Sequence, residues 1–136
     1  MKINKVHVIR LKKGEEIVSK LTDFCSANKI SNGIVYAIGA VSAAELALYR
    51  LEDKKYFFKT FDEPMEICSL NGNVTLLEKK PTLHLHIVLG DEQFETFGGH
   101  LKRAVVSATC EATIIELDSK IKRKYDEEIG LNLLDI

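Results

Sequence analysis

Alternation of polar and apolar residues constrains the fold of this chain more than any other feature of the sequence. The clearest case is the stretch 82–89, Thr-Leu-His-Leu-His-Ile-Val-Leu. The stretches 3–11 and 108–117 alternate in the same way, and 34–41 and 65–77 are further strand-like runs. A period of two is the period of a β-strand, whose successive side chains point to opposite faces. The pattern therefore predicts a protein built mainly of strands.

A single segment has clear helical spacing. Between Glu15 and Asn28 the apolar residues recur at helical intervals, and acidic residues stand at the first turn, where the helix dipole favours them. Residues 44–51 and 54–61 predict a hairpin around Glu52-Asp53, and Asn71-Gly72-Asn73 is a candidate break in the run 65–77. We expect an α+β fold, with a mainly antiparallel sheet of about seven strands and one long helix packed on it. A second, short helix is a candidate.

One helix is too little to cover so many strands. The other sheet face then needs a different covering, and self-association is the simplest source of one. The sequence shows no linker, repeat or low-complexity segment, so we expect a single domain over 1–136.

The composition of the chain limits the classes of function that it can have. Lys plus Arg is 19 and Asp plus Glu is 20, a net charge of −1, which disfavours a domain that grips nucleic acid by phosphate neutralisation alone. The basic run 120–124 is interpreted as a solvated segment balanced by the acids that follow it. No apolar run approaches the roughly 20 residues of a membrane span, and the first ten residues do not have the pattern of a signal peptide. We therefore expect a cytoplasmic protein with no membrane partner, and Cys25, Cys68 and Cys110 as reduced core thiols.

Three of the four histidines lie within seventeen residues. His84 and His86 are two apart in a predicted strand and share one face, and His100 follows the flexible pair Gly98-Gly99. Three imidazoles leave tetrahedral Zn²⁺ one open position, as in catalytic or ligand-binding sites. The alternative is that the histidines are ordinary polar residues of a solvated sheet face. On geometry alone the two interpretations stand about even.

Other charged residues are candidates for supporting roles. Glu111 lies in an alternating strand, where it is either a carboxylate that orients an imidazole or binds metal, or a solvated strand residue. The solvated interpretation is favoured, as it is for Arg10 and Glu45. No nucleophile elbow or phosphate-binding glycine loop occurs, so serine-hydrolase and nucleotide-hydrolysing chemistry has no motif support.

Several motifs together resemble the PPC domain (plants and prokaryotes conserved domain). They are Leu-His-Leu-His-Ile-Val-Leu-Gly-Asp at 83–91, Gly-Gly-His-Leu at 98–101 and Ala-Thr-Cys-Glu at 108–111. The resemblance runs from about Val8 to Leu117 and implies an α+β fold assembled as a homotrimer. It also implies a divalent metal site, zinc by preference, formed by His84, His86 and His100 near a subunit boundary. Glu111 and Arg10 are candidate supporting residues on the sequence alone.

Plant members of that family carry AT-hook segments that bind DNA, and this sequence has no Arg-Gly-Arg-Pro hook. DNA is therefore a weakly supported partner. Our leading hypothesis is a homotrimeric binding protein with a three-histidine metal site and a small ligand that the sequence does not name. The alternative is a metal-dependent enzyme acting on a small molecule, with Glu111 or Glu95 as general base.

Overall fold

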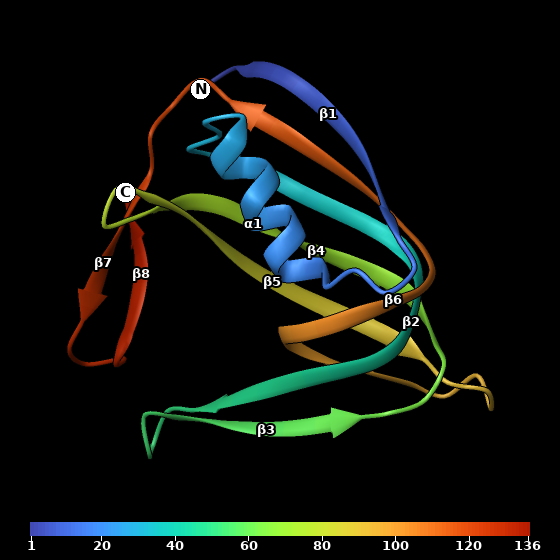
Figure 1. Cartoon of the computed structure of the whole chain (residues 1–136). Helices are drawn as coiled ribbons and strands as arrows, with labels where there is room; N and C mark the ends of the chain where they lie inside the picture. The colour runs from blue at the N-terminus through green and yellow to red at the C-terminus, as the bar shows by residue number, and fades with distance from the viewer.

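The computed structural model describes all 136 residues and contains eight strands and one helix (Figure 1). The strands belong to one mixed sheet, and its pairings are antiparallel except for a parallel contact between β4 and β7. In chain order the elements are β1 (Ile3–Lys12), α1 (Ile17–Ala27), β2 (Gly33–Arg50), β3 (Lys55–Phe61), β4 (Met65–Leu77), β5 (Lys80–Gly90), β6 (Thr96–Leu117), β7 (Lys122–Asp126) and β8 (Leu131–Asp135).

Two long strands close the sheet on itself. β2 and β6 pair along most of their length, and each also pairs with the β4–β5 hairpin, so the pairings form a ring in the order β2, β6, β5, β4. Register shifts in β2 and β6 allow these strands to bend. At Gly39, which has φ 149°, a Cβ atom would lie 2.1 Å from the carbonyl oxygen of Thr109. Only glycine fits so close a backbone approach.

The helix covers one face of this sheet, as Figure 1 shows for α1 in front of β4 and β5. Its buried residues Ile17, Leu21 and Cys25 join a core cluster of 23 residues, whose strand residues come from β1, β2, β4, β5 and β6. Glu16 caps the helix by accepting hydrogen bonds from the backbone N–H of Val18 and Ser19 at 3.0 and 2.7 Å. It also accepts one from the N–H of Ala104 at 3.1 Å, which ties the helix start to β6.

The coarse expectation of a mainly antiparallel sheet with a helix packed on it is confirmed, and several details differ. The sheet has eight strands instead of about seven, because the tail forms the β7–β8 hairpin. The helix has 11 residues and is the only one. Asn71-Gly72-Asn73 does not break β4, because these residues pair with β2 and β5. The runs 34–41 and 44–51 are parts of one strand, β2, which ends at Arg50 and pairs with β6 across several register shifts.

Two of the three cysteines are core thiols as expected. Cys25 and Cys110 are buried, and burial raises the pKa of their thiols to about 12 and about 11. Cys68 is exposed, so its prediction as a core residue was wrong. It lies in β4 beside a register shift, where the alternation of inward and outward residues is interrupted.

No helix covers the second face of the sheet, which we call the open face. Residues directly opposite each other in antiparallel strands share a face, and the register places one row across five strands: Val8, Thr113, Tyr36, Asn71 and His86. Apolar side chains on this face are strongly exposed, with Val6 at 52%, Val8 at 82%, Tyr36 at 51% and Ile38 at 59%. No helix of the structure has the length and hydrophobicity that crossing a bilayer would require.

Candidate metal centre

Strand register brings the three histidines together. His84 and His86 are two residues apart on β5, and His100 on β6 lies directly opposite His86. The three rings therefore share the open face, with centroids 5.1 to 5.6 Å apart. One nitrogen from each ring lies within 4.8 Å of the others. Two strands alone thus position the cluster, and Gly98-Gly99 belong to β6 instead of forming a separate turn.

The spacing of the nitrogen atoms suits a tetrahedral metal. The Nε2 atoms of His84 and His86 are 3.2 Å apart. With Zn–N bonds of about 2.0–2.1 Å, two ligands of a tetrahedral ion are separated by about 3.3 Å. The Nδ1 atom of His100 is buried and has no hydrogen-bond partner. Such an orphaned nitrogen is unusual in a folded protein, and coordination would satisfy it, so the residues fit a divalent metal.

Burial favours the neutral form of two of the rings, His84 and His100. Burial, followed by the neighbouring charges of His84, His86 and Lys102, lowers the pKa of His100 to about 4. Burial also lowers the pKa of His84, with smaller contributions from His86 and Arg123. Neutral imidazole is the form that binds metal. The cluster is therefore ready to accept a cation at neutral pH without first losing protons from these two rings.

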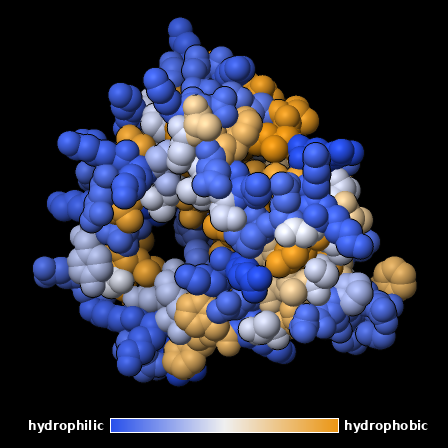
Figure 2. All heavy atoms as spheres, in the orientation of Figure 1, coloured by the Kyte–Doolittle hydropathy of each residue, from blue (hydrophilic) through white to orange (hydrophobic).

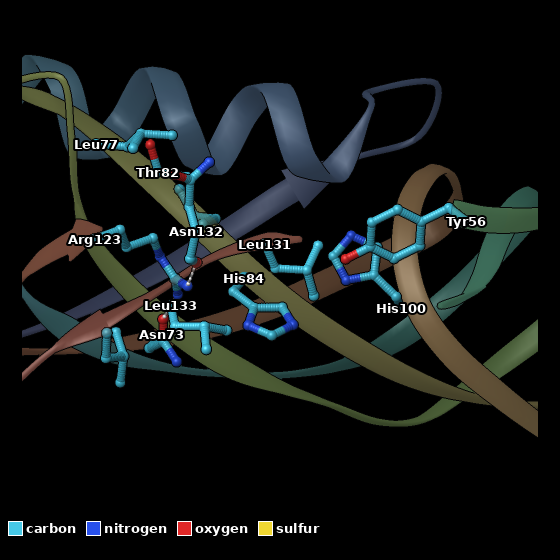
Figure 3. Close-up of a pocket in the computed structure, with 12 residues that line it drawn as sticks. Tyr56, Asn73, Leu77, Thr82, His84, His100, Arg123, Leu131, Asn132 and Leu133 are labelled. Atoms are coloured by element: carbon cyan, nitrogen blue, oxygen red, sulfur yellow. Dashed lines mark hydrogen bonds between the residues drawn. The ribbon is translucent and has the colours of Figure 1, made fainter. Parts of the chain in front are cut away.

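A pocket of about 410 Å³ lies beside the cluster. Its polar lining comes from Tyr56, Asn73, Thr82, His84, His100, Arg123 and Asn132, and its apolar lining is made of leucines. Figure 3 shows His84 between Arg123 on one side and the adjacent rings of His100 and Tyr56 on the other. The Tyr56 and His100 ring centroids are 5.1 Å apart. In Figure 2 a hollow is visible beside the β7–β8 hairpin, the element that contributes Arg123 and Asn132 to this pocket.

Not every candidate from the sequence lies at this site. Glu111 and Arg10 are register partners on β6 and β1. Glu111 lines a different part of the open face, beside Ile38 and Cys68, and neither residue lines the histidine pocket. Glu45 is opposite Thr60 and Arg103, and Glu95 is an exposed residue just before β6.

The pocket also contains residues that sequence reasoning missed, above all Arg123. The basic run 120–124 was interpreted as solvated, but Arg123 is half-buried while Lys122 and Lys124 on either side are exposed. Alternation within this run could have indicated an inward-pointing arginine, but only if 122–126 had been recognised as a strand. Tyr56 and Asn73 enter the pocket from β3 and β4, and no local motif marks them.

Comparison with known proteins places this geometry in a family. Residues 1–118 match the model of the Plants and Prokaryotes Conserved (PCC) domain. A metal-containing protein from Archaeoglobus fulgidus is 36% identical and superposes with a TM-score of 0.93, over 98% of this chain and 94% of that chain. A putative DNA-binding protein from Bacteroides thetaiotaomicron is 32% identical, with a TM-score of 0.94 over 99% of this chain and 94% of that chain.

A curated relative, the bifunctional protein GlmU of Synechococcus sp. (strain JA-3-3Ab), is 29% identical over 129 residues. These residues are 93% of this chain and 20% of the relative, so the chain spans about a fifth of that protein's length. The match of the domain model to most of the chain agrees with the resemblance seen in the histidine and glycine motifs. This chain belongs to the Plants and Prokaryotes Conserved domain family.

Proposed function

We propose that the chain is a metal-dependent binding protein in which His84, His86 and His100 hold one divalent ion, zinc by preference. The observation that carries this proposal is the convergence of three imidazole nitrogens within 4.8 Å, one pair of them at 3.2 Å. The metal-containing relative from Archaeoglobus fulgidus supports it. A zinc ion with three protein ligands keeps a fourth position for water or another ligand and acts there as a Lewis acid.

Zinc binding by the His86→Ala variant tests the proposal. We expect the wild-type chain to bind one zinc ion, measured by elemental analysis and by titration calorimetry. Since losing a partner that merely orients a ligand already weakens metal binding about 10–100-fold, losing His86 itself should weaken it more than about 100-fold. Val88→Ala is the matched control, because Val88 is the next residue of β5 on the same face and should leave zinc binding unchanged. Equal zinc affinity in wild type and His86→Ala would contradict the proposal.

We further propose that the chain assembles as a homotrimer through the open face of the sheet. The exposed residues Val6 and Val8 on β1 and Tyr36 and Ile38 on β2 flank β6 on this face, and a gathering of exposed apolar side chains favours an interaction site. Three copies follow from the family resemblance. The same face carries the histidines, so the metal centre would lie near the contact between subunits.

The mass in solution tests the assembly. Light scattering should give three times the 15.3 kDa of one chain. The double variant Val8→Asp, Ile38→Asp should reduce the mass to that of one chain, because buried unpaired carboxylates strongly oppose association. Phe94→Asp is the control, since Phe94 is 93% exposed but lies in the loop after β5. A wild-type protein that is monomeric at all concentrations would contradict the proposal.

The name of the Bacteroides relative raises DNA as a partner. With a net charge of −1 and no Arg-Gly-Arg-Pro hook, the chain has little excess positive charge to neutralise the phosphates of DNA. We therefore expect no retardation of duplex DNA by the isolated protein at low salt. Retardation that weakens steeply as salt increases would show that the chain binds DNA on its own.

A further inference from the structure

Arg123 is a cation without an anion. It takes part in none of the chain's three ion pairs. Its guanidinium instead donates to three neutral oxygens: Thr75 Oγ1 at 2.8 Å, Asn132 O at 2.9 Å and Asn73 Oδ1 at 2.7 Å. A guanidinium has five N–H donors, so two of them remain free. The three bonds fix the position of the group and leave its charge uncompensated.

The surroundings of Arg123 make this missing partner significant. Burial lowers the pKa of Arg123, and the Tyr56 phenol is the only ionisable group that opposes this effect. A partly desolvated charge is normally paired in a protein. Because Arg123 lines the same pocket as His84 and His100 (Figure 3), the place for its counter-charge is next to the metal centre.

The rest of the pocket indicates what kind of anion would fit. Its apolar wall consists of Leu77, Leu83, Leu131, Leu133 and Leu134. The pocket volume of about 410 Å³ is in the range of sites for small molecules. Arg123 is the only lysine or arginine in the lining. A single fixed guanidinium facing leucines suits a planar monoanion with an aliphatic body better than a nucleotide or a free phosphate.

The β7–β8 hairpin supplies the arginine and three of the leucines that line this pocket. Arg123 and the segment Leu131–Leu134 all belong to it, and it lies beyond residues 1–118 that match the domain model. The metal ligands, in contrast, lie within the matched region. The hairpin therefore supplies a charged and apolar wall beside the metal centre, and it belongs to the shared fold, because the solved relatives superpose over 98–99% of this chain.

We propose that this pocket binds a small aliphatic carboxylate, whose charged group pairs with Arg123 and whose hydrocarbon part contacts the leucines. The inference rests on the proposed metal function, because it places the ligand beside that ion. The contribution of Arg123 itself can nevertheless be measured separately from metal binding.

Binding of butyrate by zinc-loaded protein, measured by ligand-observed NMR, tests the inference. Affinity should increase about fourfold for each methylene from acetate to butyrate, which corresponds to about 0.8 kcal/mol per buried CH₂ group. Arg123→Gln should weaken butyrate binding at least tenfold and leave the zinc content unchanged. Lys124→Gln removes the same charge from the exposed neighbouring position on β7 and should leave butyrate binding unchanged.

Each outcome has a distinct meaning. Equal butyrate binding by wild type and folded Arg123→Gln would overturn the inference, as would no butyrate binding by wild type. If Arg123→Gln does not fold, the series from acetate to butyrate in the wild type still tests the inference. In the wild type, phosphate binding more tightly than butyrate would overturn it. If wild type takes up no zinc, the proposed metal function fails, and the same comparison in metal-free protein still decides the role of Arg123.

Discussion

The helix-covered face and the open face of the sheet are made by the same strands, and on β5 they carry opposite kinds of side chain. On β5, Leu85 and Ile87 point to the covered face and are 2% and 1% exposed. The residues between and beside them, His84 and His86, point to the open face and form the candidate metal centre. Alternation thus assigns packing and chemistry to neighbouring residues of one strand.

The two faces also differ in how completely their polar atoms are bonded. Two buried side-chain atoms in the chain have no hydrogen-bond partner, His100 Nδ1 and Thr109 Oγ1. Both belong to open-face positions, since His100 is opposite His86 and Thr109 is two residues from Glu111. Unpaired buried groups destabilise a protein, and the proposed metal site and subunit contact would give such atoms partners on this face.

Adjacent substitutions on β5 test this division directly and should have the largest effect on stability. Leu85→Ala should lower the free energy of unfolding by about 2–5 kcal/mol, because it leaves a cavity in the core. His86→Ala, measured without metal, should change it by less than about 1 kcal/mol, as is usual for exposed positions. Urea denaturation of the two variants measures both values. Similar losses in the two variants would show that the open face also contributes to core stability.

The sequence predicts this division well where it depends on local pattern. Alternation in 82–89 identified the strand, put His84 and His86 on one face and Leu85 on the other, and Gly98-Gly99 drew attention to His100. The helix was located to within two residues at its start and one residue at its end. These features follow from periodicity and turn chemistry, which act over a few residues.

What the sequence did not predict depends on contacts between distant segments. The pairing of His86 with His100 comes from the register of β5 and β6, and Arg123 reaches the pocket because β7 meets β4 in a single parallel pair at Leu76 and Lys122. Neither pairing has a local signature. Glu111 shows the converse, since its strand was predicted but it lies near the far end of β6 from His100 and lines a different pocket from the histidines.

The cap of the helix tests how firmly the covered face is held, with a smaller expected effect. Glu16 accepts three backbone hydrogen bonds, two from the first turn of α1 and one from Ala104 in β6. Glu16→Ala should therefore lower the free energy of unfolding by about 1–2 kcal/mol, as loss of an N-cap does. Asp23→Asn is the control, because Asp23 is an exposed residue of the same helix. A Glu16→Ala variant as stable as the control would show that packing alone holds the helix on the sheet.

The smallest expected effect is a pH dependence at the edge of the covered face, where the His7 ring packs against Phe24 of α1. A hydrogen bond from His7 Nε2 at 2.9 Å, assisted by one from Asn4, lowers the pKa of the Glu116 carboxyl below its ordinary value. The carboxylate is thus favoured in the folded state. Its stabilising contribution is complete above the unfolded pKa and is lost as pH falls through the folded pKa.

Glu116→Gln should therefore lower the free energy of unfolding at pH 7 by less than about 1 kcal/mol, since Glu116 is partly exposed to solvent. The difference from wild type should shrink as the pH falls below the ordinary carboxyl range. Urea midpoints of both proteins between pH 3 and about pH 7 measure this dependence, with Glu63→Gln, at an exposed position outside the strands, as the control. If the difference in unfolding free energy between wild type and Glu116→Gln stays constant with pH, Glu116 acts through its shape and through hydrogen bonds that do not need its charge. The covered face is then held at this edge by packing, without an electrostatic contribution.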